Sequence, residues 1–175
     1  MATYHTETKD KLSKSLWRLL ESNTLERITI TMICQEAGIG RRSFYRHFKS
    51  KWNVIEYEVK QKSDEFATLC TESRTMEELI EMSFRFFKRQ KKLLSLLEQN
   101  DLMSVLYSFM QSSLFESKLN IYMRRSGIPM YMREYVANAI AATHISLIMT
   151  WVNRNFREDW REFARFELSM FSVMK

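Results

Sequence analysis

The stretch that decides the fold runs from residue 33 to residue 51 and reads Ile-Cys-Gln-Glu-Ala-Gly-Ile-Gly-Arg-Arg-Ser-Phe-Tyr-Arg-His-Phe-Lys-Ser-Lys. Two short segments with apolar positions flank a turn that carries Gly38 and Gly40. The eleven residues from Arg41 to Lys51 contain five Lys or Arg and no acidic residue. A helix, a tight glycine-containing turn and a second, basic helix form the arrangement that places a helix in the major groove of DNA.

The first segment has the spacing of a short helix. Ile30, Ile33 and Ala37 lie at i, i+3 and i+7, which places them on one helical face. Thr29 precedes that face, where its hydroxyl can accept a free backbone N–H of the first turn. Gly38 follows the face, where a residue with positive φ ends a helix. We therefore predict a helix capped by Thr29 and closed by Gly38.

The second segment is predicted to be a helix with polar outer faces. Phe44 and Phe48 are four residues apart and anchor it on the first helix. Gly40 stands at the cap position and offers no side-chain acceptor. The outer side chains are long donors, a hydroxyl, an imidazole and a phenol, groups that contact phosphates and base edges: Arg41, Arg42, Ser43, Tyr45, Arg46 and His47.

These residues carry a family resemblance. Thr29-Ile30, Ile33, Ala37-Gly38-Ile39, Phe44-Tyr45-Arg46-His47-Phe48 and Lys51 resemble the N-terminal signature of the TetR/AcrR family of transcriptional regulators, over roughly residues 8 to 55. The resemblance implies a three-helix helix-turn-helix DNA-binding domain over residues 1–50. A long helix would join it to a helical effector-binding and dimerisation domain over residues 51–175.

The resemblance also implies which residues contact DNA. Tyr45, His47 and Lys51 match positions that contact phosphates in the family. Thr31, Arg41, Arg42 and Ser43 match positions that reach bases or nearby phosphates. The full predicted DNA-binding set is Thr29, Thr31, Arg41, Arg42, Ser43, Tyr45, Arg46, His47 and Lys51.

The chain departs from the family pattern at two positions. Gly40 stands where a serine-like cap is usual, and Cys34 stands where a small residue, commonly alanine, is usual. The adjacent charges of Arg41 and Arg42 are unusual at this position, so the operator sequence does not follow from the family.

Composition favours an all-α fold with a split in charge. The 175 residues include 45% apolar residues, one proline and three glycines, so long helices can run uninterrupted, whereas sheet-rich folds need more turn residues. Residues 1–63 hold 12 Lys or Arg against 7 Asp or Glu, and residues 64–175 hold 15 against 14. A basic N-terminal third on a nearly neutral remainder fits a DNA-binding head on a body with another task.

The chain is expected to be cytoplasmic and to need no cofactor or metal. The first ten residues are polar, and no apolar run approaches the roughly 20 residues that span a bilayer. Cys34 and Cys70 are not expected to form a structural disulfide. His5, His47 and His144 show no zinc-ligand spacing, and no phosphate-binding glycine loop or Gly-x-Ser-x-Gly elbow occurs, so no enzyme is predicted.

Apolar periodicity predicts further helices on both sides of the basic segment. A helix of about 20 residues, capped by Ser50, would be long enough to link head and body as a lever. Gly127-Ile128-Pro129 is the clearest break in the body. The other predicted helices cover about residues 8–22, 76–87, 93–97, 102 to before 127, 131–154 and 159 onward.

The last two predicted helices are apolar around more than one stripe, whereas a surface helix of a monomer needs one. Small residues such as Ala139 and Ala142 permit close helix approach. We predict that these helices pair with their copies in a four-helix homodimer interface, as the resemblance also implies. The alternative is that both stripes are buried within one body. The predicted interface residues are Val136, Ala139, Ile140, Thr143, Leu147, Trp160, Phe163, Leu168 and Phe171.

Ten of the twelve methionines lie in the body, among many aromatic residues. Such side chains can line an adaptable apolar pocket, and the resemblance implies a small apolar or amphipathic effector. Plain core packing, or a body that binds a protein partner, is the alternative. The predicted pocket residues are Met82, Phe86, Met103, Tyr107, Met110 and Tyr122.

Three single features have two interpretations each. His144 is predicted to be a hydrogen-bonding residue of the core or interface rather than a sensor or ligand. The run from Lys88 to Lys92 is predicted to be a solvated bend at a helix C-terminus, with a second phosphate patch as the alternative. Cys34 is predicted to pack as a small apolar residue, with oxidant sensing as the alternative.

The combined prediction is a sequence-specific DNA-binding transcriptional regulator. It would be a homodimeric repressor relieved by a small-molecule effector, and its partner would be double-stranded DNA carrying a near-palindromic operator. The rival is a helical dimeric protein-interaction module, or a regulator that responds to a protein partner, without a small-molecule pocket. Salt-dependent binding to the DNA that flanks its own gene separates the two.

Overall fold

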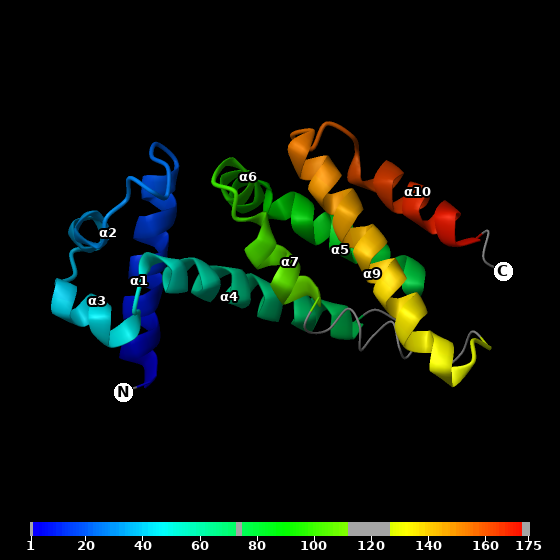
Figure 1. The fold of residues 1–175 in the computed structure, drawn as a ribbon, viewed down its shortest axis with the longest axis horizontal. Helices are drawn as coiled ribbons and strands as arrows, with labels where there is room; N and C mark the ends of the chain where they lie inside the picture. Colours follow the sequence, from blue (N-terminus) through cyan, green and yellow to red (C-terminus); the bar gives the residue numbers. More distant parts are fainter. Residues whose placement is uncertain (1, 73–74, 112–126, 173–175) are drawn as a thin grey trace. The chain divides into compact units, whose positions relative to one another are not determined.

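The computed structural model describes residues 2–72, 75–111 and 127–172, and every regular element within these ranges is a helix, as predicted (Figure 1). The N-terminal helices are α1 (Ala2–Leu20), α2 (Ile30–Ala37), α3 (Arg41–His47) and α4 (Lys51–Glu72). The later ones are α5 (Met76–Arg89), α6 (Lys91–Gln99), α7 (Met103–Gln111), α9 (Met130–Asn153) and α10 (Trp160–Ser172). Most of the helix predicted from residue 102 to before residue 127 lies outside the described residues.

The chain divides into two compact units, Met1–Gln61 and Lys62–Lys175. This boundary lies inside α4, later than the predicted division between residues 50 and 51. The first turns of α4 belong to the first unit because side chains tie them to α1. Tyr57 Oη donates to Asp10 Oδ1 at 2.7 Å, and Ser13 Oγ donates to Glu58 Oε2 at 2.7 Å.

The apolar stripe of α1 forms the base of the first unit. Leu12, Leu16 and Leu20 follow one another at four-residue spacing and are at most 3% exposed. The helix packs on α2 and α3, whose Ile33 and Phe44 are fully buried. It begins at Ala2, earlier than the predicted residue 8.

The turn between α2 and α3 has the predicted cap geometry. The backbone N–H of Met32 donates to Thr29 Oγ1 at 3.2 Å, so Thr29 caps α2. Gly38 ends α2 with a φ of 64°, in the left-handed region. Gly40 precedes α3 and makes no side-chain cap hydrogen bond.

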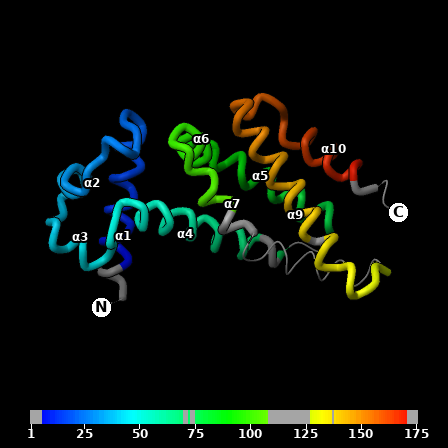
Figure 2. The backbone as a smooth tube through the Cα atoms, in the orientation of Figure 1, coloured from blue at the N-terminus to red at the C-terminus, as the bar shows by residue number. Residues whose placement is uncertain are grey.

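An aromatic cluster holds the second unit together. In this unit α10 packs along α5, and α9 packs against α6 and α7 (Figure 2). The fully buried ring of Phe84 on α5 has its centroid 5.0 Å from that of His144, and 5.8 Å from those of Trp151 and Phe163. Trp151 and Phe163 stack at 5.6 Å. The cluster therefore joins α5, α9 and α10.

A polar chain crosses the same core. Ser83 Oγ lies 2.5 Å from His144 Nε2, and His144 Nδ1 lies 2.7 Å from Glu167 Oε2. All three side chains are completely buried, and Glu167 Oε1 has no hydrogen-bond partner among the residues that the structure describes. His144 is thus a hydrogen-bonding residue of the core, one of its two predicted places. The order of serine, histidine and carboxylate is that of a hydrolytic triad, but complete burial closes the serine to a substrate.

The basic run that begins at Lys88 engages the end of α9. Lys88 Nζ donates to Phe156 O at 3.2 Å and lies 5.3 Å from the ring centre of Trp151. Lys91 Nζ donates to Asn155 O at 3.4 Å. These carbonyls follow α9, where the backbone turns through positive φ. Both ammonium groups therefore serve a helix C-terminus, as the bend interpretation favours, rather than a phosphate patch.

We expect Glu167→Leu to lower the free energy of unfolding by about 3 kcal/mol, because it leaves the Nδ1–H of His144 buried without an acceptor. Urea unfolding at fixed protein concentration measures the change. Replacing His144 and Glu167 together with leucine should cost less than the sum of the two single changes. Glu162→Gln, on an exposed position of α10, is the control and should change little. Additive losses in the double variant would contradict the pairing.

We expect Gly38→Ala to lower the free energy of unfolding by about 1 kcal/mol, because its φ of 64° is strained for any residue with a Cβ. Apart from the glycine and its two chain neighbours, no atom of the described residues lies within 4 Å of the added Cβ, so we assign the cost to backbone strain. Gly38→Asn is the matched control at the same site, since asparagine adopts the left-handed region more readily than alanine and should lose less stability. Thermal unfolding of both variants tests this, and equal losses would exclude the left-handed backbone as the cause.

Candidate nucleic-acid interface

Two buried phenylalanines orient α3. Phe44 is fully buried and Phe48 is 5% exposed, with their ring centroids 6.0 Å apart. The ring of Tyr45 stands edge-on to that of Phe44 at 5.6 Å, yet Tyr45 is 51% exposed. Because residues four apart share a helical face, burying these two rings turns the positions between them outward.

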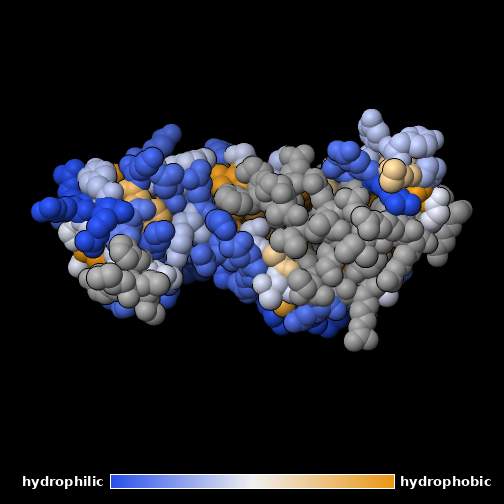
Figure 3. Space-filling model, turned by 90° about the horizontal axis from the view of Figure 1, so that it is seen from below, coloured by the Kyte–Doolittle hydropathy of each residue, from blue (hydrophilic) through white to orange (hydrophobic). Residues whose placement is uncertain are grey.

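The outward face of α3 is basic. Arg41, Arg42 and Arg46 are exposed. A surface groove of about 690 Å³ is lined by Gly40, Arg42, Ser43, Tyr45 and Arg46. Arg46 Nη2 donates to Ser43 Oγ at 3.3 Å, which holds this guanidinium along the helix. Figure 3 shows hydrophilic side chains over much of the visible face of the first unit, at the left.

The other predicted DNA-binding residues lie outside this groove. Thr31 is exposed on the first turn of α2, and Thr29 is exposed but uses its hydroxyl oxygen as the cap. His47 is half-buried at the end of α3. Lys51 is half-buried, and its Nζ donates to the backbone carbonyls of Leu25, Glu26 and Ile28. The structure thus brings four of the predicted DNA-binding residues together in the groove. Thr29 and Lys51 instead make hydrogen bonds within the first unit.

Cys34 lies beneath this surface as a core residue. It is 5% exposed, and burial raises the pKa of its thiol, against the opposing influence of the Arg41 charge. A thiol kept protonated is a poor nucleophile and reacts slowly with oxidants. This supports the predicted packing role.

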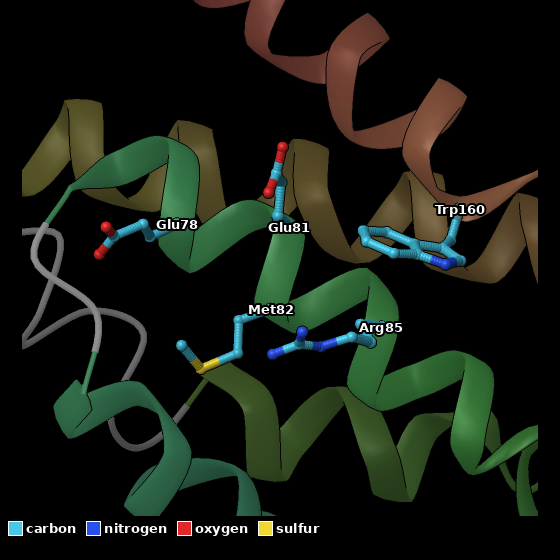
Figure 4. Close-up of a pocket in the computed structure, with 5 residues that line it drawn as sticks. All are labelled: Glu78, Glu81, Met82, Arg85 and Trp160. Atoms are coloured by element: carbon cyan, nitrogen blue, oxygen red, sulfur yellow. The ribbon is translucent and has the colours of Figure 1, made fainter.

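Met82 lines a pocket of about 230 Å³ together with Glu78, Glu81, Arg85 and Trp160 (Figure 4). Of the predicted effector residues whose side chains the structure describes, Phe86, Met103 and Tyr107 do not line it. Four of the five side chains come from α5 and the fifth from the first residue of α10. Met82 and Arg85 point to one side of α5 and Glu81 to the other (Figure 4). Three of the five side chains that line the pocket are therefore charged, which differs from the apolar, enclosed pocket that was predicted.

The remaining predicted effector residues have mixed positions. Phe86 is 3% exposed with its ring centroid 5.1 Å from that of Phe66, as plain core packing requires. Met103 is 8% exposed and Tyr107 is 36% exposed. The side chain of Met110 and the whole of Tyr122 lie outside the described residues.

The predicted dimer residues divide between core and surface. Ile140 is 5% exposed, and the half-buried Phe163 packs its ring on Phe84 and Trp151, so both side chains contribute to the core of the second unit. Ala139 is exposed, whereas Val136, Thr143, Leu147, Trp160 and Leu168 are half-buried, and the Phe171 side chain lies outside the described residues.

The sequence analysis did not single out three exposed aromatic residues of α9 and α10 whose side chains the structure describes. Tyr131 and Tyr135 on α9 are 76% and 72% exposed, and Phe166 on α10 is 54% exposed. The i, i+4 spacing of the two tyrosines was the available signal, since it places them on one face of the helix.

Comparison with known proteins agrees with this arrangement. Residues 14–57 match the model of the tetR family of bacterial regulatory proteins. An HTH-type transcriptional regulator of Staphylococcus aureus (strain USA300) is 31% identical over 62 residues, which cover 35% of this chain and 34% of that relative. The match thus spans about a third of the relative's length.

Solved structures match along nearly the whole chain. A TetR transcriptional regulator from Streptococcus agalactiae has a TM-score of 0.70 and 17% identity, covering 97% of this chain and 96% of that one. NalD, the secondary repressor of the MexAB-OprM multidrug efflux pump in Pseudomonas aeruginosa, has a TM-score of 0.68 and 16% identity, covering 96% of each chain. The N-terminal segment 14–57 is thus similar to the DNA-binding domain of the tetR family of bacterial regulatory proteins, and the chain as a whole has the fold of these solved TetR-type regulators.

Proposed function

We propose that the chain is a homodimeric repressor that binds double-stranded DNA, with α3 of each subunit in the major groove of one half of a near-palindromic operator. The observation that carries the proposal is the exposed basic face of α3, held outward by the buried Phe44 ring. The segment from Arg41 to Lys51 contains no acidic residue that would repel phosphates. A cytoplasmic location fits this partner.

The side chains of α3 divide between two tasks in this proposal. Arg41 and Arg42 read base edges, because an exposed guanidinium can donate two hydrogen bonds to guanine. Tyr45 and His47 contact phosphates and set the register of the helix on the duplex. Arg46, whose guanidinium donates to Ser43 Oγ, adds a positive charge that attracts the phosphates of the DNA backbone.

The dimer would form on the exposed sides of α9 and α10. By length and composition, α9 is apolar enough to span a membrane, and 41% of its most apolar window is buried. Its exposed positions include Tyr135, Ala139 and Ala142, and those of α10 include Phe166 and Met170. A second subunit would cover these apolar surfaces, and the alanines allow close helix approach.

Relief of repression by an effector is the part of the proposal that draws on the family alone. NalD is a repressor of an efflux pump. The effector would have to favour one spacing of the two DNA-binding units, with α4 as the transmitter because it begins in one unit and ends in the other. The charged pocket around Met82 favours the rival view, in which the body responds to a protein partner rather than to an apolar molecule.

For the DNA contacts we expect Arg41→Ala and Arg42→Ala each to reduce the preference for operator over random DNA by roughly 1–3 kcal/mol. Tyr45→Ala should weaken binding to both DNAs alike, because a phosphate contact carries no sequence information. Fluorescence anisotropy with the DNA that flanks the chain's own gene measures both. Equal losses on the two DNAs for both arginine variants would refute their assignment to bases.

For the dimer we expect Phe166→Glu to shift the chain toward monomer, because two like charges would meet in an apolar contact. Sedimentation equilibrium at micromolar concentration reports the mass. Glu98→Arg, a charge change at an exposed position of α6, is the control and should leave the mass unchanged. A wild-type chain that sediments as a monomer would exclude the proposed homodimer.

A further inference from the structure

Lys51 makes an unusual set of hydrogen bonds within the first unit. Its Nζ lies 2.6 Å from Leu25 O, 2.9 Å from Ile28 O and 3.3 Å from Glu26 O. All three carbonyls belong to the segment between α1 and α2, whereas Lys51 is the first residue of α4. The side chain therefore joins the beginning of α4 to the chain that leads into α2.

The chemistry of the ammonium group restricts what else it can bind. A lysine ammonium has three N–H donors and no acceptor, and three carbonyls engage all of them. A cation at the first residue of a helix also meets the positive end of the helix dipole, so it needs nearby partial negative charge. The converging carbonyl oxygens supply that charge. A hydrogen bond to a DNA phosphate would require the ammonium to give up one of them.

The segment held by Lys51 controls the start of α2. Ile28 is 1% exposed, and the next residue, Thr29, caps α2 through the backbone N–H of Met32. The cap fixes the first turn of α2, which carries the exposed Thr31, and α2 packs directly on α3. A displacement of this segment would thus be passed to the surface that is proposed to meet DNA.

We infer that Lys51 is a positioning residue for DNA recognition, which fixes α2 and α3 in their relative pose, and not a phosphate ligand. The inference rests on the proposed DNA-binding function and assigns Lys51 a role different from the phosphate contact that the resemblance implies. The two roles differ in their salt dependence, because each neutralised phosphate contributes about −0.9 to the slope of log affinity against log salt.

The test compares Lys51→Met with Lys49→Met, which removes the same charge from an exposed lysine two residues away. Affinities for operator and random DNA are measured across a salt series, at a temperature where circular dichroism shows each variant fully folded. For Lys51→Met we expect an unchanged salt slope and a preference for the operator reduced by roughly tenfold, comparable with the loss of one base contact. Amide hydrogen exchange at Met32 and Ile33 should be faster in this variant. Lys49→Met should leave the operator preference and both exchange rates unchanged.

A slope shallower by about 0.9 with an unchanged operator preference would overturn the inference and restore the phosphate contact. Faster amide exchange at Met32 and Ile33 with an unchanged salt slope and an unchanged operator preference would also overturn the inference, because Lys51 would then stabilise the unit without affecting DNA recognition. If Lys51→Met does not fold, Lys51→Gln, whose amide keeps two N–H donors, goes through the same series. A wild-type chain with no preference for the operator would instead refute the proposed function.

Discussion

Burial of the Phe44 ring fixes the orientation of α3, and the proposed DNA-binding surface depends on that orientation. The ring is fully enclosed in the first unit, where α1, α2 and α3 pack together. Burying a phenylalanine contributes about 2–3 kcal/mol, whereas an exposed ion pair contributes about 0–1 kcal/mol. Burial of the apolar side of α3 therefore decides the orientation of the helix. The arginines lie on the outer side because the buried phenylalanines occupy the inner side.

The turn before α3 also leaves the orientation of this helix to its packing. The left-handed Gly38 ends α2 abruptly, and Gly40 starts α3 without a side-chain cap. A helix as short as α3 has few hydrogen bonds of its own, so it depends on its packing partners for order. The hydrogen bonds from Lys51 tie the first residue of α4 to the segment that leads into α2, which is one of those packing partners.

The second unit combines apolar stacking with a buried polar chain. The rings of Phe84, Trp151 and Phe163 join α5, α9 and α10, and several arrangements of aromatic rings have similar energies. The hydrogen bonds of His144 to Ser83 and Glu167, by contrast, form only when the three side chains are correctly placed. A buried chain of this kind adds little net stability but penalises any packing that leaves one of its members unpaired.

Composition could not separate a binding pocket from a core in this body. Methionine and phenylalanine fill both kinds of site for the same reason, since both exclude water. The structure uses Phe86 and Met103 as buried core residues, and it surrounds Met82 with charged side chains. Only the three-dimensional arrangement shows which of these residues still meet solvent.

The sequence alone determined the local geometry of the head: the cap at Thr29, the end of α2 at Gly38, the buried faces of Phe44 and Phe48, and the outward arginines. These follow from spacings of three to seven residues, which the periodicity of a helix makes visible in one chain. The tertiary structure decided which distant groups meet. Lys51 binds carbonyls more than 20 residues earlier, and Ser83 lies 61 positions from His144. It also turned Ile140 inward and Tyr135 outward. Such pairings depend on how helices pack, and no local pattern encodes them because each face of an apolar helix looks alike in sequence.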